Sequence, residues 1–334
     1  MYYIIVNPIA GKGRTLTKLP LLTRLFDAHS LPYEVVVTQS MMDAYTKAKA
    51  ICETDGTTGI IGIGGDGTIQ EIAAGMYAAS PGKVPVPLGI FPGGSGNDFV
   101  MTLAGGKGKA LAKYKNKNAQ ASAEDFFTAI RTGRTTCVDL ITANGMAFMN
   151  IGNVGLDARV VRNAVALKQR FGRYAYLAAV YQSIARHTNM PLTVEIDGKT
   201  LEGEYTLVAA CNGQYYGGGL HICPSASLTD GKITLCLVKA MSRPKTMTIF
   251  PSLMIGRHHR LKAISFIECE EARITLKRGA ESLSLDGNLY EVTGQGGSSF
   301  TDQERRFLSP HRLHGADKGE MHFKVVPRGI SIFL

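Results

Sequence analysis

Residues 59–79 read GIIGIGGDGTIQEIAAGMYAA, and this segment determines how the rest of the chain is interpreted. Its first residues are short, apolar and partly β-branched, which predicts a buried strand at Gly59–Ile63. Thr68–Ala79 carries apolar residues at helical spacing, which predicts a helix. Glycines surround Asp66 between the two elements, so backbone N–H groups and the positive end of the helix dipole can hold anionic oxygens there. The segment therefore predicts a strand, a phosphate-binding turn and a helix.

The remainder of the first hundred residues repeats the alternation of strand and helix. Further helices are expected at Thr17–Ala28 and Asp43–Cys52. Further strands are expected at Tyr2–Val6, Tyr33–Val37 and Val86–Phe91. Strands that alternate with helices pair in parallel through crossover connections. We therefore expect an α/β N-terminal domain with a parallel sheet over residues 1–135.

From about Val138 the pattern changes to strand after strand, interrupted by one long helix expected at Arg173–His187. The helix places Tyr181 and Ile184, among others, on its predicted core face. We expect an antiparallel β-sandwich domain over residues 136–322, with residues 323–334 returning as a last strand. The expected strands are Asp139–Thr142, Met146–Asn150, Leu192–Ile196, Tyr205–Cys211, Ile233–Lys239, Ala263–Glu268, Ala272–Leu276 and Gly329–Phe333.

Composition narrows the class of protein. The chain has 334 residues, 45% of them apolar, which fits about two globular domains. Its six cysteines include no C-x-x-C pair, which argues against a zinc ribbon and a secreted disulfide framework. No apolar run approaches the roughly 18 to 20 residues that span a bilayer, so we expect a soluble, untargeted chain. The formal charge of +10 indicates an anionic partner.

Two segments are expected at the surface. Residues 105–118 carry five lysines between Lys107 and Lys117 and no acid, and they are either a solvated loop or a point of attraction to an anionic membrane leaflet. Gln295–Lys318 is polar, contains three glycines and has few strand signals.

Other phosphate-binding motifs do not fit. Gly62–Gly67 matches G-x-G-x-x-G, but a dinucleotide site needs an acidic residue about 20 positions later, and none occurs between Ile72 and Asn97. The only Gly-Lys-Thr triplet, at 198–200, lacks the earlier glycine of a P-loop. The His-Arg-Asp and Asp-Phe-Gly triplets of protein kinases are missing from the sequence, as is any basic-aromatic motif for nucleic acid.

Two further glycine clusters follow predicted strands. NPIAGKG at 7–13 follows the first strand, and PGGSGND at 92–98 follows the fourth. In a parallel sheet all three turns lie at the carboxyl edge, where ligands bind. They supply backbone donors, the cations Lys12 and Arg14, and carboxylates that suit magnesium. Together they predict a site for a nucleoside triphosphate with Mg²⁺.

These motifs resemble the catalytic domain of diacylglycerol kinases, lipid kinases related to sphingosine and ceramide kinases. The likeness rests on GGDGT at 64–68 with Glu71, on Asn7-Pro8 and on GSGND at 94–98. It continues through Asp139-Leu140, NIGNVGLDAR at 150–159, the glycines 217–219, PSA at 224–226 and DGK at 230–232, and ends at Asp286-Gly287 and the strands of 323–333. It implies an α/β N-terminal domain of the NAD-kinase and diacylglycerol-kinase type, a C-terminal β-sandwich, and an active site in the cleft between them.

The resemblance also implies site residues. A structural magnesium would bind the Asp230 side chain and the carbonyls of Ser227 and Lys232, with an unliganded Asp-Gly hairpin as the alternative. The residues expected to bind ATP are Asn7, Pro8, Ala10, Gly11, Thr38, Gly64, Gly65, Asp66, Gly67, Thr68, Gln70, Glu71, Ser95, Asn97 and Asp98.

The catalytic base is expected at Asp286. The family's C-terminal motif is usually Asp-Gly-Glu, and one of its carboxylates takes the proton from the lipid hydroxyl. This chain reads Asp286-Gly287-Asn288, so either Asp286 is the base or the protein is catalytically impaired. Asp66 is the second expected catalytic residue and would organise the metal and its waters.

The function implied is transfer of the γ-phosphoryl group of ATP to the hydroxyl of a membrane lipid, with diacylglycerol as the expected acceptor. The alternatives are a kinase of a soluble acceptor such as NAD and a non-catalytic pseudokinase that senses a nucleotide or lipid. We expect a cytoplasmic protein that contacts the anionic inner face of the membrane peripherally and binds no nucleic acid. A homodimer is left open.

Overall fold

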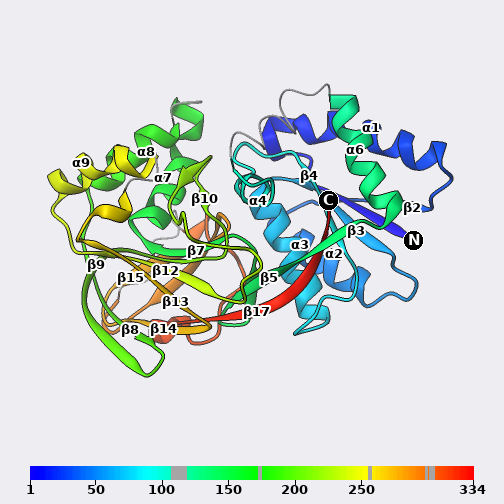
Figure 1. Cartoon of the computed structure of the whole chain (residues 1–334). Helices are drawn as coiled ribbons and strands as arrows, with labels where there is room; N and C mark the ends of the chain where they lie inside the picture. Colours follow the sequence, from blue (N-terminus) through cyan, green and yellow to red (C-terminus); the bar gives the residue numbers. More distant parts are fainter. Residues whose placement is uncertain (107–118, 172–174, 255–257, 298–299, 301–304) are drawn as a thin grey trace. The chain divides into compact units, whose positions relative to one another are not determined.

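The structure is a computed structural model that describes residues 1–106, 119–171, 175–254, 258–297, 300 and 305–334 (Figure 1). The lysine run at 107–117 lies outside the described residues. The chain forms two compact units. Unit 1 comprises Met1–Leu140, Leu228–Gly231 and Val326–Leu334, and unit 2 comprises Ile141–Ser227 and Lys232–Val325.

Unit 1 contains the predicted parallel sheet. Its strands are β1 (Tyr2–Val6), β2 (Tyr33–Val37), β3 (Gly59–Gly64) and β4 (Leu88–Pro92), in the order β4-β3-β1-β2. Each neighbouring pair is parallel, and the end of β17 (Glu320–Phe333) joins β4 at Ile332, also in parallel. The α/β fold predicted for this part of the chain is therefore confirmed.

Helices cover both faces of this sheet. Ile61 and Ile63 of β3 share a core with Phe26 of α1 (Arg14–Ala28) and Phe127 of α6 (Ala119–Thr132). The opposite face meets α3 (Asp66–Ala79), because a Cβ on Gly62 would lie 2.6 Å from Ile69 and 2.8 Å from Ile72. The remaining helices in the described residues of unit 1 are η1 (Ala10–Gly13), α2 (Asp43–Cys52) and α4 (Asp98–Leu103).

Unit 2 is built from antiparallel strands. Its sheet path runs β16-β15-β7-β9-β8-β14-β17, and β12 pairs with β9 and β13. Every described pair of named strands within the unit is antiparallel, as predicted. The bounds are β5 (Thr135–Ala143), β6 (Met146–Phe148), β7 (Ile151–Gly155), β8 (Met190–Ile196), β9 (Lys199–Cys211), β10 (Tyr215–Tyr216), β11 (Leu220–His221), β12 (Ile233–Lys239), β13 (Ile264–Cys269), β14 (Glu271–Leu276), β15 (Ala280–Leu285) and β16 (Asn288–Thr293).

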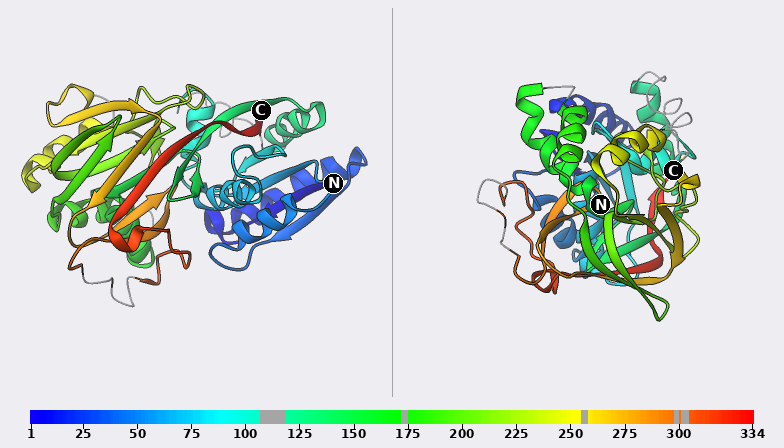
Figure 2. Two further views of the ribbon diagram at one scale, coloured as in Figure 1. Left: turned by 90° about the horizontal axis from the view of Figure 1, so that it is seen from below. Right: turned by 90° about the vertical axis from the view of Figure 1, so that its left-hand side faces the viewer.

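The prediction of one helix in the second half is wrong. The structure has α7 (Leu156–Phe171), α8 (Ala175–Ala185) and α9 (Arg243–Met254), and Figure 2 shows them beside the strands of unit 2. Tyr181, predicted on the core face of α8, has 52% of its surface exposed, whereas Ile184 is buried. The expected strand Met146–Asn150 also divides, because β6 ends at Phe148 and β7 begins at Ile151.

Two findings concern the expectations about disulfides and membrane spans. All six cysteines lie within the described residues, and none forms a disulfide. In the described part of the chain, every helix is too short or too polar to cross a bilayer.

Candidate active site

The glycine turn after β3 is closely packed. A Cβ on Gly64 would lie 2.6 Å from the Cβ of Thr68, and a Cβ on Gly94 would lie 2.5 Å from the Cα of Gly65. The amide of Gly93 donates to the carbonyl of Gly64 at 2.8 Å. The turns that follow the neighbouring strands β3 and β4 therefore contact each other directly, and only glycine permits the approach.

Asp66 links these two turns. Its Oδ2 accepts a hydrogen bond from the amide of Asn97 at 2.8 Å, and its Oδ1 accepts one from the amide of Asp98 at 2.8 Å. Removal of the side chain from water raises the pKa of Asp66, against the effect of these backbone hydrogen bonds. Asp66 thus positions the first residues of α4.

Asn97 shapes the second turn. It has a left-handed backbone, with φ at 55°, which asparagine tolerates better than most residues. Its Oδ1 accepts from the amide of Gly94 at 3.0 Å, and its Nδ2 donates to the carbonyl of Gly94 at 3.1 Å. Ser95, between them, is exposed, and Asp98 at the start of α4 is buried.

The turn after β1 reaches the other two. Nδ2 of Asn7 donates to Oγ1 of Thr68 at 2.9 Å, and a Cβ on Gly11 would lie 2.0 Å from the carbonyl oxygen of Gly93. Gly11, Lys12 and Gly13 all have positive φ. The three glycine turns therefore lie together at the carboxyl edge of the parallel sheet, as their positions after the strands indicate.

One cation at this edge was missed from the sequence. Lys18 donates to the carbonyl of Pro92 and lies over the ring of Phe91, with its Nζ 5.4 Å from the ring centroid. Burial and the charge of Arg14 lower the pKa of Lys18. The sequence signal that could have identified Lys18 is its position one helical turn after Arg14. Lys12, Arg14 and Lys18 give this edge a positive charge that suits anionic oxygens.

The predicted ATP-binding residues divide into two sets. Thr38 follows β2 and is buried, and Gln70 and Glu71 are buried in α3. Glu71 accepts hydrogen bonds from the amides of Met42 and Ala44, so its described partners lie before and at the start of α2. The other predicted residues lie in the three turns or at the ends of the elements that flank them: Asn7, Pro8, Ala10, Gly11, Gly64, Gly65, Asp66, Gly67, Thr68, Ser95, Asn97 and Asp98.

Asp286 lies in unit 2, in the turn between β15 and β16. Both Asp286 and Gly287 have positive φ, as an Asp-Gly hairpin turn requires. Its Oδ2 accepts from the amide of Met149 at 2.8 Å, and its Oδ1 accepts from the amide of Ile151 at 2.7 Å. The amide of Asn150 contacts both oxygens, at 3.1 and 3.2 Å. The half-buried carboxylate therefore fixes the segment that precedes β7.

A buried asparagine beside Asp286 has an unused acceptor. Nδ2 of Asn150 donates to the carbonyl of Tyr215 at 2.8 Å. Its Oδ1 is buried and has no hydrogen-bond partner among the described residues, and the same is true of Oδ1 of Asn153. Both belong to the NIGN motif, which the sequence singled out without assigning either oxygen a role.

The groups expected to bind magnesium are the carboxylate of Asp230 and the carbonyls of Ser227 and Lys232. Asp230 is exposed. The side chain of Lys232 forms an ion pair with Glu268 at 2.7 Å, so only the carbonyl of Lys232 is assigned to the magnesium site. Asp139, fully buried, accepts from the amides of Gly231 and Arg328, each at 2.7 Å, and so fixes the turn. Among the described residues no three His, Cys, Asp or Glu side chains gather as a metal cluster. One carboxylate with carbonyls and waters nevertheless fits the way Mg²⁺ is usually bound.

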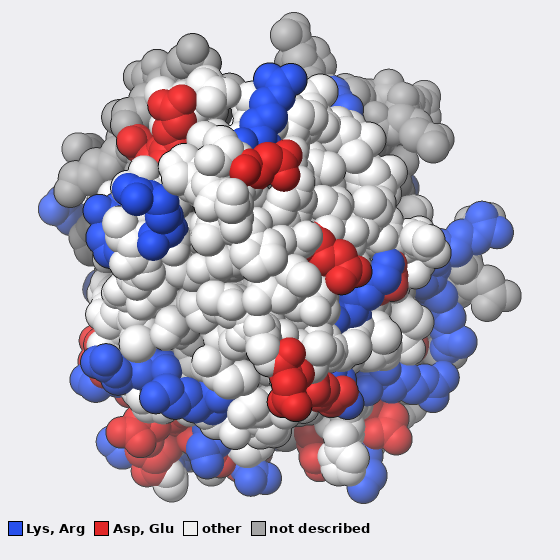
Figure 3. All heavy atoms as spheres, turned by 90° about the vertical axis from the view of Figure 1, so that its right-hand side faces the viewer, with Lys and Arg blue, Asp and Glu red and all other residues white. Residues whose placement is uncertain are grey.

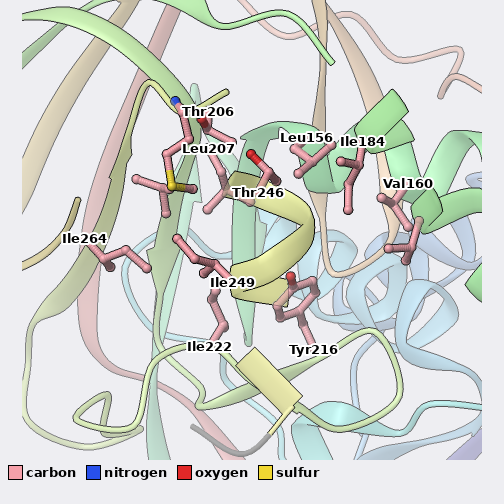
Figure 4. A pocket seen from close by; sticks show the side chains of 13 residues that line it. Leu156, Val160, Ile184, Thr206, Leu207, Tyr216, Ile222, Thr246, Ile249 and Ile264 are labelled. Carbon is pink, nitrogen blue, oxygen red and sulfur yellow. Dashed lines mark hydrogen bonds between the residues drawn. The ribbon is translucent and has the colours of Figure 1, made fainter. Parts of the chain in front are cut away.

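Unit 2 also contains a narrow apolar pocket of about 50 Å³ (Figure 4). Leu156 and Val160 come from α7, Ile184 from α8 and Ile249 from α9. The side chains of β9 and of Tyr216 and Ile222 close the other side. The threonine hydroxyls in its wall already bond to other groups, Thr246 to the carbonyl of Ser242 and Thr206 to Asn189. The pocket is therefore suited to a hydrocarbon group.

Family models and relatives with kinase names match this chain over most of its length. The family model described as diacylglycerol kinase catalytic domain matches residues 1–143, and the one described as YegS C-terminal NAD kinase beta sandwich-like domain matches residues 151–300. A diacylglycerol kinase of Mycobacterium tuberculosis is 27% identical over 268 residues, 78% of this chain and 80% of the relative. A diacylglycerol kinase of Bacillus subtilis is 26% identical over 290 residues, 85% of this chain and 88% of the relative.

The fold has a solved counterpart. A crystal structure from Bacillus anthracis str. Sterne covers 99% of this chain and 96% of its own, with a TM-score of 0.68 and 23% sequence identity. At this identity the likeness supports the fold of both units.

Proposed function

We propose that this chain, whose residues 1–143 match the family model described as diacylglycerol kinase catalytic domain, is a lipid kinase that uses ATP to phosphorylate diacylglycerol. The acceptor hydroxyl oxygen attacks the γ-phosphorus, and the bond from that phosphorus to the β–γ bridging oxygen breaks. ADP leaves, the hydroxyl proton is taken up by a base or water, and the lipid product is phosphatidic acid.

The observation that carries the proposal is the meeting of three glycine turns at one sheet edge. The amide of Gly93 donates to the carbonyl of Gly64, and Nδ2 of Asn7 donates to Oγ1 of Thr68, so hydrogen bonds join residues of all three turns. Phosphoryl transfer needs positioning and charge neutralisation more than covalent chemistry. Turn amides would bind the triphosphate, and Lys12, Arg14 and Lys18 would offset its charge.

Magnesium is the proposed metal. When bound, it would neutralise charge on the phosphate oxygens. Asp98 and Asp66 are the carboxylates of the glycine turns that would organise it and its waters, and Asp230 would hold the structural ion with the carbonyls of Ser227 and Lys232. The carboxylate of Asp66 already accepts hydrogen bonds from the amides of Asn97, Asp98 and Phe99, so we propose that it would act on the metal through bound water.

Asp286 is the proposed base. The amides of residues 149–151 donate hydrogen bonds to the carboxylate of Asp286 and hold it in one orientation. It would orient or deprotonate the attacking hydroxyl, a contribution of roughly 10²- to 10⁴-fold in rate. Asn288 stands where the family usually has glutamate, so a catalytically impaired chain is the competing outcome of the test below.

The apolar pocket of unit 2 is the proposed site for part of the lipid tail. In the present conformation its 50 Å³ would admit only a few water molecules, so helices α7, α8 and α9 would have to move apart. Helices α7 and α8 share a small core of their own, formed by Val160, Ala179, Val180 and Ile184, and Met247 of α9 packs against it. Displacing these helices is therefore less costly than opening the main core.

A lipid acceptor implies peripheral contact with a membrane. The formal charge of +10 would draw the protein to an anionic leaflet, which we propose to be the cytoplasmic face of the membrane.

The test is transfer of radiolabelled γ-phosphate from Mg-ATP to a panel of acceptors. The panel contains diacylglycerol, monoacylglycerol, ceramide, sphingosine, undecaprenol and NAD, with Asp286→Asn assayed beside the wild type. Label in diacylglycerol that falls by roughly 10² or more in the variant supports both the acceptor and the base. Label in NAD alone would make the protein a soluble-acceptor kinase, and ATP binding without any transfer would make it a pseudokinase.

A further inference from the structure

A second pocket of unit 2, separate from the apolar one, has no role in the function proposed above. It has a volume of about 620 Å³ and lies between α7, the segment after α8 and the β14–β15 turn. Four arginines line it, Arg159, Arg162, Arg186 and Arg278, against a single acid, Glu281. Its formal charge is therefore +3 among the described lining residues.

The single acid is already neutralised. Arg159 and Glu281 form a two-bond ion pair, with Nε to Oε2 at 3.0 Å, and their side chains are only 14% and 10% exposed. Nη1 of Arg159 also donates to Oγ1 of Thr188 at 3.0 Å. This pair forms one wall of the pocket and leaves no acidic side chain of the described lining to oppose Arg186 and Arg278.

Of the other three arginines, Arg162 contacts an aromatic ring, and Arg186 and Arg278 are exposed to solvent. Arg162 lies over the ring of Phe300, 5.0 Å from the centroid, which orients its guanidinium. Arg186 and Arg278 are exposed, and neither has an ion pair with any described residue. The backbone of Arg278 is fixed by a bridge to Gln295, and the amide of Lys277 beside it donates to the carbonyl of Pro191 at 3.0 Å.

We propose that this pocket binds a phosphate group. Guanidinium groups bind phosphate oxygens through paired N–H bonds, and several arginines around one concave site match a multiply charged anion. The polar wall formed by Asn163 and Ser183, joined by a hydrogen bond of 2.8 Å, offers neutral partners for its remaining oxygens. The chemistry fits either the phosphate of a membrane lipid headgroup or a free phosphate monoester.

The pocket shares its helices with the apolar pocket. Arg159 and Arg162 stand on α7 between and beside Leu156 and Val160, and Ser183 precedes Ile184 on α8. A phosphate bound to these arginines would therefore stabilise the same two helices that line the apolar pocket. Anion binding and the position of α7 and α8 are coupled in this account.

The experiment measures binding without ATP, so its result is independent of the kinase proposal. The probes are inorganic phosphate and glycerol 3-phosphate by calorimetry, and vesicles of phosphatidylcholine with or without phosphatidylglycerol by sedimentation. The variant is Arg186→Gln with Arg278→Gln, and the matched control is Arg260→Gln with Arg273→Gln, two exposed arginines of unit 2 outside the pocket. All four side chains are exposed, so we expect both proteins to fold.

The pocket variant should bind at least one class of probe about 25-fold more weakly than the control does, at about a fivefold loss for each arginine removed. Loss confined to the anionic vesicles identifies a lipid headgroup, and loss with the soluble phosphates identifies a free phosphate. Phosphate should also raise the Tm of the wild type and the control but not of the pocket variant. Equal binding by variant and control, or no binding of any probe by the wild type, would overturn the proposal.

Discussion

Asp66 is the residue on which the packing of two glycine turns depends. The sequence marked it as a residue of the nucleotide site, because a carboxylate among glycines at a helix start is typical of one. The structure adds that its two oxygens accept the amides of Asn97 and Asp98, residues more than thirty positions away. Such partners depend on how β3 and β4 are aligned, which no local pattern specifies.

We predict that Asp66→Ala destabilises the protein by about 2 to 4 kcal/mol, because the partly buried amides of Asn97 and Asp98 lose their acceptor. The midpoint of urea unfolding measures the change. Asp55→Ala is the control, because Asp55 is exposed and the substitution removes the same carboxylate group. Equal midpoints for the two variants would show that the amides of residues 97 and 98 do not need Asp66.

The link between α3 and α2 depends on a buried glutamate. Burial raises the pKa of Glu71 to about 7, although the amides of Met42 and Ala44 donate to its carboxylate. The folded protein therefore binds a proton that the unfolded chain releases between about pH 4.5 and pH 7. Stability must fall as pH rises through that window.

We predict that Glu71→Gln removes this pH dependence, because the amide keeps an acceptor and never ionises. The variant should match the wild type near about pH 4 and be more stable by on the order of 3 kcal/mol at about pH 8. Urea unfolding at both values measures the difference, with Glu53→Gln, an exposed glutamate at the end of α2, as the control. A wild type that gains stability relative to Glu71→Gln as pH rises would contradict the account.

The prediction about binding of the lipid tail concerns the helices of unit 2. Ile249→Trp places a larger side chain between α9 and the apolar pocket, so transfer to diacylglycerol should fall at least tenfold while ATP binding is retained. The control is Leu201→Trp, which changes a half-exposed residue of β9 outside the pocket. Comparable loss in both variants, or full activity in Ile249→Trp, would remove the pocket from the substrate site.

Elements with one clear period were predictable from the sequence. Strands β1 and β2 and helix α2 have the bounds that apolar runs and helical spacing indicate. Helix α7 was missed because it follows directly on β7, so the apolar run of the strand continues into LDARVVRNAVALKQRF with no turn residue between the two elements. The expected face of α8 failed at Tyr181, because exposure there depends on which neighbours cover the helix.

At the scale of the whole molecule, the order of motifs was more informative than composition. The charge of +10 left nucleotide, nucleic acid and membrane all open, and on the face shown in Figure 3 basic and acidic side chains are interspersed around a broad uncharged area. The three glycine clusters, each after a parallel strand, predicted one shared edge, and the structure brings Asn7, Thr68 and Gly93 together there. The arginine pocket had no counterpart in the sequence pattern, because its members come from residues 159 to 278.

The most direct test of the central claim is transfer of labelled γ-phosphate from Mg-ATP to diacylglycerol by three proteins: wild type, Gly94→Ala and Gly203→Ala. A Cβ on Gly94 would lie 2.5 Å from the Cα of Gly65, whereas a Cβ on Gly203 meets nothing closer than 3.7 Å. We predict labelled phosphatidic acid from the wild type and the Gly203 variant, and at least roughly 10²-fold less from the Gly94 variant. A wild type that labels no lipid, or a Gly94 variant as active as the wild type, would contradict the claim that lipid phosphorylation depends on the packed glycine turns.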